Sequence, residues 1–405
     1  MSAAGDATAH HTGSWKMSYF LNEDQRLMRD VAAKFARNEL MPIANQIDLT
    51  ETTPEWVTNR CGELGFLGVF IPEAYGGLGS DLTTACLILE EIAKASPAFA
   101  GLLSVEMILC PEVVRILGNE EQKQRLLPAS ASGERVMAYS QTEPAGAANV
   151  AFHQTRLTQD GNGYRLNGHK LFCTQGHAKT YLVMCRTEKD GAQGYGCVIV
   201  EAEDEGFQVQ KYEEKLGWRG TNTGPIAFTE VAISADDILG NILSGGPDHA
   251  PANQVSFIGH AATSLGCMEG LFDLTKEYVL QRELYGEPMT RLSPVTDRMA
   301  QIWTKIEACR SLLYMSTRMH DEGGLTLPMG SACKAYICET AFECTSQLLQ
   351  MWGGSGIMHS TGVNRYMRDA RAKMVAEATT EMHHSIIAGT IGLGGPFASL
   401  ADRLG

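Results

Sequence analysis

The hydrophobic pattern of this chain changes its period twice along the sequence, and that change limits the folds it can form. Apolar residues first recur every three to four positions, for example between Leu27 and Phe35, which is the period of an α-helix. From Val136 to about Val231, short apolar runs alternate with Gly, Asn and Asp turns, as they do in strands. Helical periodicity returns after Asn253 and continues toward the C-terminus. We therefore predict an α+β fold in which a β-domain lies between two helical regions.

This pattern divides the chain of 405 residues into four expected segments. They are a disordered tail over 1–18, an all-helical N-terminal domain over 19–135, a middle β-domain over 136–245 and a C-terminal helical bundle over 246–405. The first residues carry no apolar run of the kind found in a signal peptide. Ligands favour the borders between domains, so we expect the functional site at a border of the β-domain.

Several helices and strands within these segments can be predicted from the period alone. Asn22 is expected to be the N-cap of the first helix. The clearest expected helices cover residues 82–95, 120–127, 261–283, 295–322 and 329–351. The clearest expected strands cover residues 164–168, 181–185, 197–200 and 226–228.

Composition narrows the possible partners and the compartment. The formal net charge of -14 argues against nucleic acid and anionic membrane surfaces as partners. No stretch approaches the roughly 20 apolar residues that span a bilayer. The eleven cysteines are odd in number and form no C-x-x-C pair, which indicates free thiols in a reducing compartment. We therefore expect a cytoplasmic protein without disulfides.

Two motifs of the β-domain could face a flat ligand. The run from Tyr139 to Asn149 contains Pro144 and Gly146, and the amides of such an irregular loop can point at a ligand. Phe172 and Thr174 stand two positions apart in a strand, where a ring system could stack on one and hydrogen-bond to the other. An ordinary connecting loop and a half-buried strand would give the same two patterns.

Two further motifs close long helices in the C-terminal region. Arg282 could bind a pyrophosphate, for which a guanidinium is suited, or it could simply complement the helix dipole in solvent. The run Gln350-Met351-Trp352-Gly353-Gly354-Ser355-Gly356 is not a G-x-G-x-x-G fingerprint and no strand precedes it, so a glycine cap explains it as well.

The last motif contains a glutamate between two alanines. An apolar setting of this kind would raise the pKa of Glu377 and suit it to general base catalysis, although a surface glutamate would give the same pattern. A metal site built from Glu381, His383 and His384 is not expected, because adjacent histidines do not share a helix face.

Taken together in order, these motifs resemble the acyl-CoA dehydrogenase family from about Tyr19 to Gly394. Five landmarks carry the resemblance: Ile71-Pro72-Glu73-Ala74-Tyr75-Gly76-Gly77, Thr142-Glu143-Pro144, Leu166-Asn167-Gly168-His169-Lys170, Tyr285-Gly286-Glu287-Pro288 and Arg365-Tyr366-Met367-Arg368-Asp369-Ala370. The resemblance implies a C-terminal four-helix domain, FAD between that domain and the β-domain, and an acyl-CoA thioester as substrate. It also implies a homotetramer, built as a dimer of dimers.

The resemblance assigns roles to individual residues. Glu377, nine residues after Arg368, would be the base that removes the α-proton while hydride leaves Cβ for flavin N5. Tyr139, Thr142, Phe172 and Thr174 would face the flavin ring, and Thr379 and Glu381 would also contact the cofactor. Arg282, Tyr285, Gln350 and Gly354 would hold the rest of FAD, with Arg282 and Gln350 reaching across a subunit boundary. Ala148, Ala378 and Glu106 match positions near the substrate.

Several positions depart from the family pattern. Ala147-Ala148-Asn149 stands where the family has Gly-Ser-Asp, and Phe172 replaces a tryptophan. Ala378 replaces the glycine after the base. Phe257 stands where an arginine usually lies near CoA, and Ser256 stands where some members keep their base.

The helix over 100–109 matches the floor of the family's acyl cavity, and Glu106 is its only charged residue. Glu106 is expected either to turn to solvent or pair with a cation, or else to lie beside a polar, unsaturated or cyclic acyl group.

Other functions on the same scaffold remain open. An acyl-CoA oxidase passes electrons to oxygen, an enoyl-CoA reductase runs the reaction backwards, and a binding module would lack the reaction altogether. Glu377 and the flavin-facing residues disfavour the binding module. The chain ends soon after the helical bundle, which favours a dehydrogenase that passes electrons to an electron-transferring flavoprotein.

Overall fold

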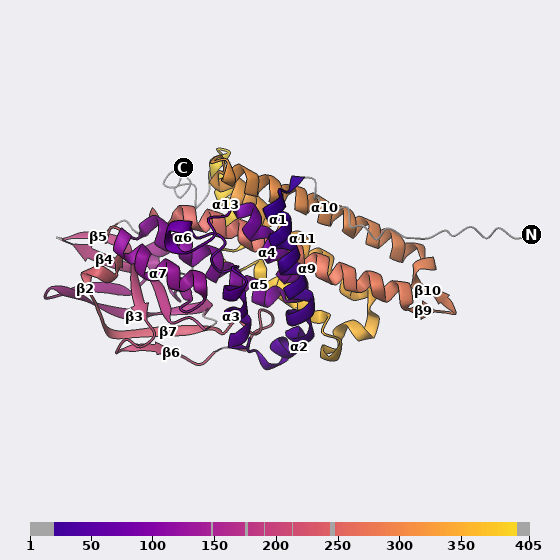
Figure 1. Ribbon diagram of the computed structural model, residues 1–405, viewed down its shortest axis with the longest axis horizontal. Coiled ribbons are helices and arrows are strands. Elements are labelled where there is room, and N and C mark those ends of the chain that lie inside the picture. The colour runs from indigo at the N-terminus through magenta and orange to yellow at the C-terminus, as the bar shows by residue number, and fades with distance from the viewer. Residues whose placement is uncertain are drawn as a thin grey trace, which may run out of the picture.

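The structure is a computed structural model that describes residues 20–394 apart from 147–148, 175–176, 190, 213 and 244–247. Figure 1 shows helices at the N-terminus, a sheet at one end of the molecule, and long helices that run from the sheet to the opposite end. The predicted α+β architecture is therefore confirmed. The expected tail over 1–18 and the last residues, 395–405, lie outside the described part.

The N-terminal region is helical, and its first helix begins as the sequence predicted. Asn22 accepts a hydrogen bond from the backbone of Gln25, whose side chain binds the Asn22 backbone in return, so the two form a capping box. The helices are α1 (Glu23–Phe35), α2 (Met41–Thr50), α3 (Glu55–Glu63), α4 (Leu82–Ala95), α5 (Pro97–Ser104), α6 (Cys110–Leu117) and α7 (Glu120–Ser132). The π-helical turn η2 (Ala36–Leu40) joins α1 to α2, and η4 (Val105–Leu109) joins α5 to α6.

The middle region is a mainly antiparallel sheet. Its strands are β1 (Met137–Ser140), β2 (Arg156–Asp160), β3 (Gly163–Thr174), β4 (Thr180–Lys189), β5 (Ala192–Glu201), β6 (Phe207–Val209), β7 (Thr223–Ile233) and β8 (Ile238–Leu239). They follow the order β6-β7-β3-β2-β4-β5-β8, with β1 paired in parallel to β4. The four strands predicted from the sequence lie inside β3, β4, β5 and β7.

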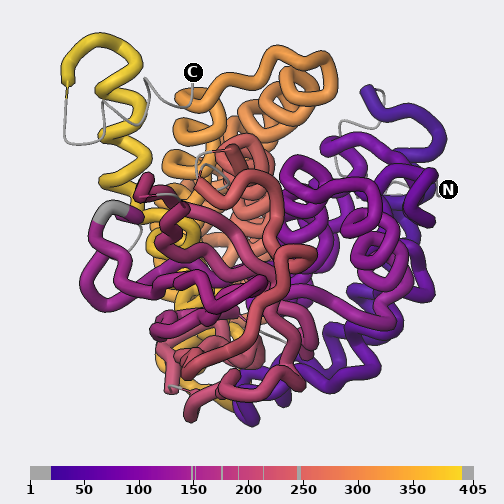
Figure 2. The backbone as a smooth tube through the Cα atoms, turned by 90° about the vertical axis from the view of Figure 1, so that its left-hand side faces the viewer, coloured from indigo at the N-terminus to yellow at the C-terminus, as the bar shows by residue number. Residues whose placement is uncertain are grey.

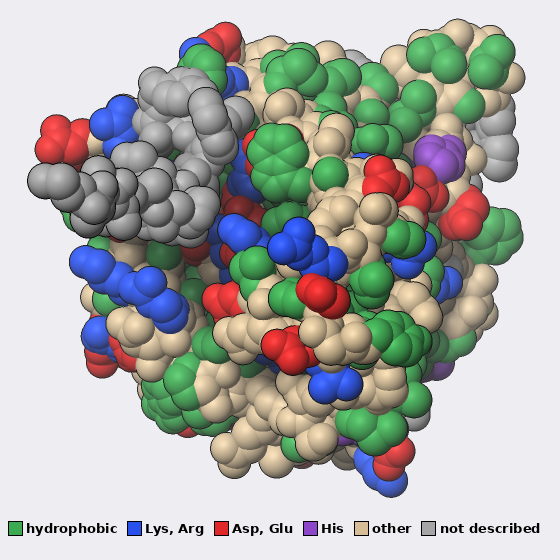
Figure 3. All heavy atoms as spheres, turned by 90° about the vertical axis from the view of Figure 1, so that its right-hand side faces the viewer, with side chains coloured by type: hydrophobic (Ala, Val, Ile, Leu, Met, Phe, Trp, Pro, Cys, Tyr) green, Lys and Arg blue, Asp and Glu red, His purple; other side chains and the backbone are tan. Residues whose placement is uncertain are grey.

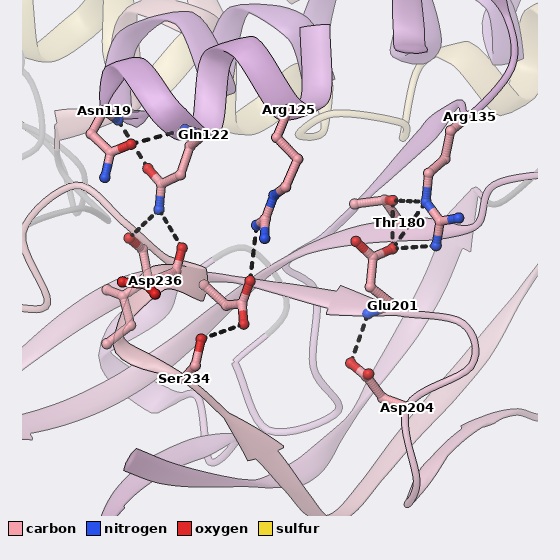
Figure 4. A network of polar contacts seen from close by, with 11 residues as sticks. Asn119, Gln122, Arg125, Arg135, Thr180, Glu201, Asp204, Ser234 and Asp236 are labelled. Carbon is pink, nitrogen blue, oxygen red and sulfur yellow. Dashed lines mark hydrogen bonds and ion pairs between the residues drawn. The ribbon is translucent and has the colours of Figure 1, made fainter. Parts of the chain in front are cut away.

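Helix α7 fixes the N-terminal helices onto this sheet (Figure 4). The side-chain amide of Gln122 donates to the carbonyls of Asp236 and Ile238 at 2.8 and 2.9 Å. Arg125 forms an ion pair with Asp237. Because Gln122 is buried at this contact, the interface is held by hydrogen bonds that water does not weaken.

The C-terminal region consists of long helices around one apolar core. They are α9 (Ala250–Gln281), α10 (Ser293–Asp321), α11 (Leu327–Met351), α12 (Asn364–Lys373) and α13 (Thr380–Thr390), with the hairpin β9 (Glu283–Leu284) and β10 (Glu287–Pro288) after α9. Figure 2, which views the molecule from the sheet end, shows the N-terminal helices on one side and the C-terminal helices on the other.

Helix α12 holds the three regions together through one of the sequence landmarks. Arg365 donates to the backbone carbonyl of Ala95, and Arg368 forms an ion pair with Asp48, both in the N-terminal helices. Asp369 accepts the backbone N–H of Trp218, at 2.6 Å, from the chain between β6 and β7. Contacts of α12 with the N-terminal helices and with the chain before β7 therefore hold the border between the domains in a defined position.

Candidate functional site

The predicted base lies in a tight turn between α12 and α13. Glu377 and Ala378 both have left-handed backbone conformations, with φ angles of 49° and 80°. Such conformations are costly for residues other than glycine and are concentrated at functional sites. Lys334, a buried residue of α11, donates to the carbonyl of Ala378 at 2.7 Å and holds the turn in place. Neither Glu377 nor Ala378 donates its backbone N–H to any residue that the structure describes.

Two side chains of α9 contact the carboxylate of Glu377, and sequence reasoning missed both roles. Ser256 donates its hydroxyl to Oε1 at 2.6 Å, and Nε2 of His260 lies 2.9 Å from the same oxygen. Oε2 of Glu377 is buried and has no partner among the described residues. One carboxylate oxygen is thus held and the other is free. The spacing of 256 and 260, one helical turn, was the available signal.

The environment of Glu377 lowers its pKa, so the expectation of a raised value was wrong. Burial alone disfavours the charged carboxylate, but the contact with His260 and the hydrogen bond from Ser256 outweigh burial. His260 is itself buried, and burial lowers its pKa even though Glu377 opposes this. Burial thus favours the neutral imidazole of His260, and a ring proton assigned to Nε2 would face Oε1 of Glu377.

A buried ion pair supports the loop that was expected to face the flavin. Lys170 and Glu143, from two of the sequence landmarks, are both fully buried and meet at 2.6 Å. Glu143 also accepts the backbone N–H groups of Gln154 and Thr155. The backbone of Leu171 donates to the carbonyl of Thr142 at 2.8 Å. These contacts fix Thr142 beside strand β3.

Phe172 is presented to solvent by an irregularity in β3. Its φ angle is 54°, and the register with β7 shifts between Lys170 and Cys173. The side chain is 65% exposed, which is unusual for a phenylalanine in a strand. Two positions on, Thr174 is half-buried and its hydroxyl lies 3.3 Å from that of Thr223. The exposed ring agrees with the expectation that a flat group could stack on Phe172, whereas the register shift beside it was not predicted.

Three other residues expected near the flavin lie around the same border. The hydroxyl of Tyr139 donates to the side chain of Gln141 and lies 2.8 Å from Nε2 of His249. Thr379 caps α13 by accepting the backbone N–H of Met382, and Glu381 is exposed in the first turn of that helix. A phosphate or ring edge beside the start of α13 would meet the positive end of its dipole.

The residues expected to bind the rest of FAD lie at the far end of α9. Arg282 and Gly354 line a pocket of about 530 Å³ whose wall includes Trp352, stacked on Tyr278. Gln350 is exposed on the chain next to this pocket, in the last turn of α11. Tyr285, at the tip of the β9–β10 turn, is 98% exposed. Figure 3 shows this end of the molecule, where hydrophobic, basic and acidic side chains are mixed on the surface.

The two groups of predicted cofactor residues are too far apart for one dinucleotide. Ser256 and Arg282 are separated by 26 positions of one continuous helix. At 1.5 Å per residue this separation is about 40 Å. Within one chain, the pocket at Arg282 therefore cannot serve a cofactor whose flavin lies beside Glu377.

Glu106 is buried, contrary to the expectation that it turns to solvent or forms an ion pair. It is 1% exposed in η4, and neither carboxylate oxygen has a partner among the described residues. Burial raises its pKa to about 8, so it is protonated near neutral pH. Ala148, the other substrate position, lies outside the described residues.

The cysteines and histidines in the described part of the chain form neither disulfides nor a cluster suited to a metal ion. All eleven cysteines are free and buried. No cluster of His, Cys, Asp and Glu in the described residues could hold a metal ion, and His383 is buried while His384 is exposed. None of the described helices combines the length and apolar character needed to cross a bilayer.

Comparison with known proteins gives one consistent result along the chain. Residues 22–134 match the family model for the N-terminal domain of acyl-CoA dehydrogenases, residues 138–231 match the middle domain, and residues 255–392 match the C-terminal domain.

Individual proteins agree with the domain matches. The short-chain specific acyl-CoA dehydrogenase of Clostridium acetobutylicum is 31% identical over 93% of this chain and 100% of its own length. The NADH-dependent acryloyl-CoA reductase of Anaerotignum propionicum is 31% identical over 92% of this chain and 95% of its own. A chain from a structure on the electron transferring flavoprotein of Acidaminococcus fermentans has a TM-score of 0.87 and 31% identity, covering 92% of this chain and 98% of that one.

Proposed function

Because this chain belongs to the acyl-CoA dehydrogenase family, a family of oxidoreductases, we propose that it uses FAD to dehydrogenate an acyl-CoA thioester at Cα and Cβ. The observation that carries the proposal is the carboxylate of Glu377. One of its oxygens is held by Ser256 and His260, and the other is buried without a partner. An ionised carboxylate with one free oxygen at a border between domains is suited to take a proton from a bound substrate.

The described residues fit FAD at that border. Phe172 exposes a ring on which a flat group can stack, and Thr142 and Thr174 lie on either side of it in the chain. Tyr139 lies near the same strand, and Thr379 and Glu381 lie at the start of α13. When bound there, FAD supplies the acceptor for the hydride that leaves Cβ. The protein positions the substrate and moves the proton.

The side chain and the backbone of Glu377 would act on different atoms of the substrate. Free Oε2 accepts the α-proton, which forms the O–H bond of the acid as the C–H bond breaks. The backbone N–H of Glu377 has no partner in the described residues and can donate to the thioester carbonyl, where negative charge develops. Ala378 would lie against the substrate in this arrangement, and Lys334 fixes its carbonyl by a hydrogen bond.

The acyl group would extend toward the helix that carries Glu106. A protonated Glu106 can donate a hydrogen bond to a polar acyl group without leaving a buried charge. This position would favour a functionalised, unsaturated or cyclic acyl-CoA over a plain fatty chain. Ala148, in the loop after Thr142, is the third residue that we assign to substrate binding by its place in the motif.

The separation along α9 supports a site shared between subunits. Arg282, Tyr285, Gln350 and Gly354 would bind the pyrophosphate and adenine parts of a cofactor whose flavin lies in a neighbouring chain. Exposed hydrophobic residues lie close to this pocket along the chain: Leu280, Ile357 and Met358. A patch of this kind marks an interface, which agrees with the proposed homotetramer built as a dimer of dimers.

The relatives support a choice of electron acceptor and leave two directions of reaction to compare. Similarity to a chain from a structure on an electron transferring flavoprotein supports that class of protein as the acceptor. Similarity to an acryloyl-CoA reductase supports enoyl-CoA reduction as the second possibility, because the same residues serve both directions. A cytoplasmic location and the domain limits at 135 and 245 stay predictions.

The test is anaerobic bleaching of the protein-bound flavin by acyl-CoA thioesters. The purified protein should be yellow, with non-covalent FAD, and at least one of butyryl-, isobutyryl-, isovaleryl-, glutaryl- and 3-phenylpropanoyl-CoA should reduce the flavin within seconds. A colourless protein that cannot be reconstituted with FAD would refute the proposal. Reduction of the matching enoyl-CoA by the dithionite-reduced enzyme compares the two directions.

A further inference from the structure

Two buried side chains of α9 lie against the carboxylate of Glu377, although removal of a proton requires only the carboxylate itself. Ser256 and His260 lie one turn apart on α9, so their side chains project from the same face of the helix. Both reach Oε1 of Glu377, from a helix more than 100 residues away in the chain. Each is fully buried. The hydroxyl of Ser256 donates to Oε1 and Nε2 of His260 lies against the same oxygen, which leaves Oε2 to turn toward a substrate.

The imidazole ring of His260 is held in place by the indole ring of Trp218. Trp218 stacks on it with a centroid distance of 5.5 Å and an interplanar angle of 22°. On this indole, Nζ of Lys373 lies 4.9 Å from the ring centroid and donates to Thr263 at 2.6 Å. The backbone of Trp218 donates to Asp369. Three elements of the fold therefore limit the movement of one histidine ring.

The backbone conformation and two nearby glycines allow the indole of Trp218 to take this position. Trp218 has a left-handed φ of 57°, and a Cβ on Gly217 would lie 2.2 Å from the carbonyl of Arg368. A Cβ on Gly101 of α5 would lie 2.8 Å from the indole. A larger residue at either position would push the indole of Trp218 away from His260. Glycine at both positions therefore permits the two rings to stack.

We propose that His260 is a positioning residue that, with Ser256, clamps Oε1 of Glu377 and so aims Oε2 at the α-hydrogen of the substrate. The proposal rests on the proposed function, since it assigns a role in proton removal. A neutral imidazole suits this role, because it donates a hydrogen bond and leaves the carboxylate as the only charge of the pair. The base stays ionised, oriented and ready to accept a proton.

Removing the donor should have two effects. Without His260 the carboxylate can rotate, and misplacement of a reacting group commonly costs about 10- to 100-fold in kcat. Burial then acts on Glu377 with less compensation, so the pKa of the base rises. Dehydrogenation needs the ionised base, so the acid limb of the kcat profile should move to higher pH.

Other titrating groups around the pair do not interfere with that limb. They are Lys334 of α11, Lys373 of α12, His383 of α13, Cys110 of α6 and Tyr139 of β1. Burial lowers the pKa of Lys373 to about 8 and that of His383 to about 3, and raises those of Cys110 and Tyr139 well above their ordinary values. The acid limb therefore belongs to the Glu377–His260 pair.

The test compares His260→Leu with His260→Gln in the FAD-loaded protein. Flavin reduction in a single turnover and exchange of the α-hydrogens with D2O are both measured from pH 3.5 to 8, using the thioester that bleaches the wild-type flavin most rapidly. We expect the Leu variant to lose at least tenfold in both rates at pH 7, with KM within threefold and a shifted acid limb. Gln keeps an N–H donor and should restore both rates to within a few-fold.

The control is Thr345→Val in α11, a fully buried residue whose hydroxyl donates only to carbonyls of its own helix. It should leave the acid limb in place. The inference is overturned if His260→Leu keeps the wild-type rates and profile with full FAD content, or if Gln is as impaired as Leu. Failure of every thioester to bleach the wild-type flavin would instead overturn the proposed function. Exchange of the α-hydrogens without bleaching of the flavin would overturn the proposed hydride transfer. The role of His260 would then be decided by the exchange rates of the two variants alone.

Discussion

Replacement of Glu106 by glutamine should make the protein more stable, and the gain should be more than twice as large at pH 8 as at pH 6. In the folded protein burial raises the pKa of Glu106 to about 8, from an ordinary value of 4.5. Between these two values the folded state keeps the proton and the unfolded state loses it. Stability contributed by this group is therefore lost as the pH rises through that interval.

The size of the effect follows from the same interval. Each pH unit costs about 1.4 kcal/mol, so the carboxyl at pH 8 lowers the free energy of unfolding by at most about 5 kcal/mol. Entry of water and small movements of η4 reduce such penalties, and about 2–4 kcal/mol is a realistic gain for Glu106→Gln at pH 8. At pH 6 only about 1.5 of these pH units have been crossed, so the upper limit of the gain falls to about 2 kcal/mol.

The assay is thermal unfolding of both proteins at pH 6 and pH 8, at equal protein and FAD concentrations. The control is Glu112→Gln, because Glu112 is equally buried in the next helix, α6, but accepts two hydrogen bonds from Arg115. That variant loses an ion pair and should be less stable at both pH values. Equal pH dependence of wild type and Glu106→Gln would refute the reasoning, since it would mean that the folded state solvates the carboxylate.

The same position tests the acyl specificity proposed above. Glu106→Leu removes the hydrogen-bond donor and keeps a buried side chain of similar length. The ratio of kcat/KM between functionalised and straight-chain thioesters should fall by about tenfold, the value of one lost hydrogen bond to substrate. An unchanged ratio would exclude Glu106 from specificity and leave its effect on stability intact.

Three further substitutions test other parts of the structure. Glu377→Gln keeps the size of the base and removes its basicity, so FAD content should be normal and flavin bleaching should slow at least about 100-fold, whereas exposed Glu339→Gln serves as a control with wild-type rates. Arg282→Ala should lower FAD retention and dissociate the assembly together, and a monomer that holds FAD in light scattering would contradict this. Lys170→Met leaves Glu143 buried without its cation, which should cost about 3–5 kcal/mol of unfolding free energy, read as a lowered Tm and a lower flavin content.

The order of domains and the main elements could be predicted because each rests on local pattern. Asn22 caps α1 as expected, and the predicted helix over 82–95 coincides with α4. The helix predicted from 261 begins eleven residues earlier, at Ala250, because its first turns are rich in small and polar residues that carry a weak periodic signal.

Details of the site depend on contacts that no local pattern contains. The prediction of a raised pKa for Glu377 used only its two alanine neighbours, whereas Ser256 and His260, from a distant helix, decide the outcome. Phe172 was placed on a regular strand, but a register shift turns its ring outward. Glu106 was expected to find solvent or a cation, and the packing around η4 provides neither.

Helix α9 carries the clamp on the base at one end and Arg282 at the other, and in the proposed assembly these ends serve different cofactors. This arrangement has a genetic consequence. A chain with a defective base still offers an intact Arg282 to its neighbour, and a chain with a defective Arg282 still offers an intact base. Two inactive alleles, one altered at each end, would therefore complement each other in mixed oligomers, whereas two alleles altered at the same end would not. Such complementation requires a change at Arg282 that weakens cofactor binding and still lets the chains assemble.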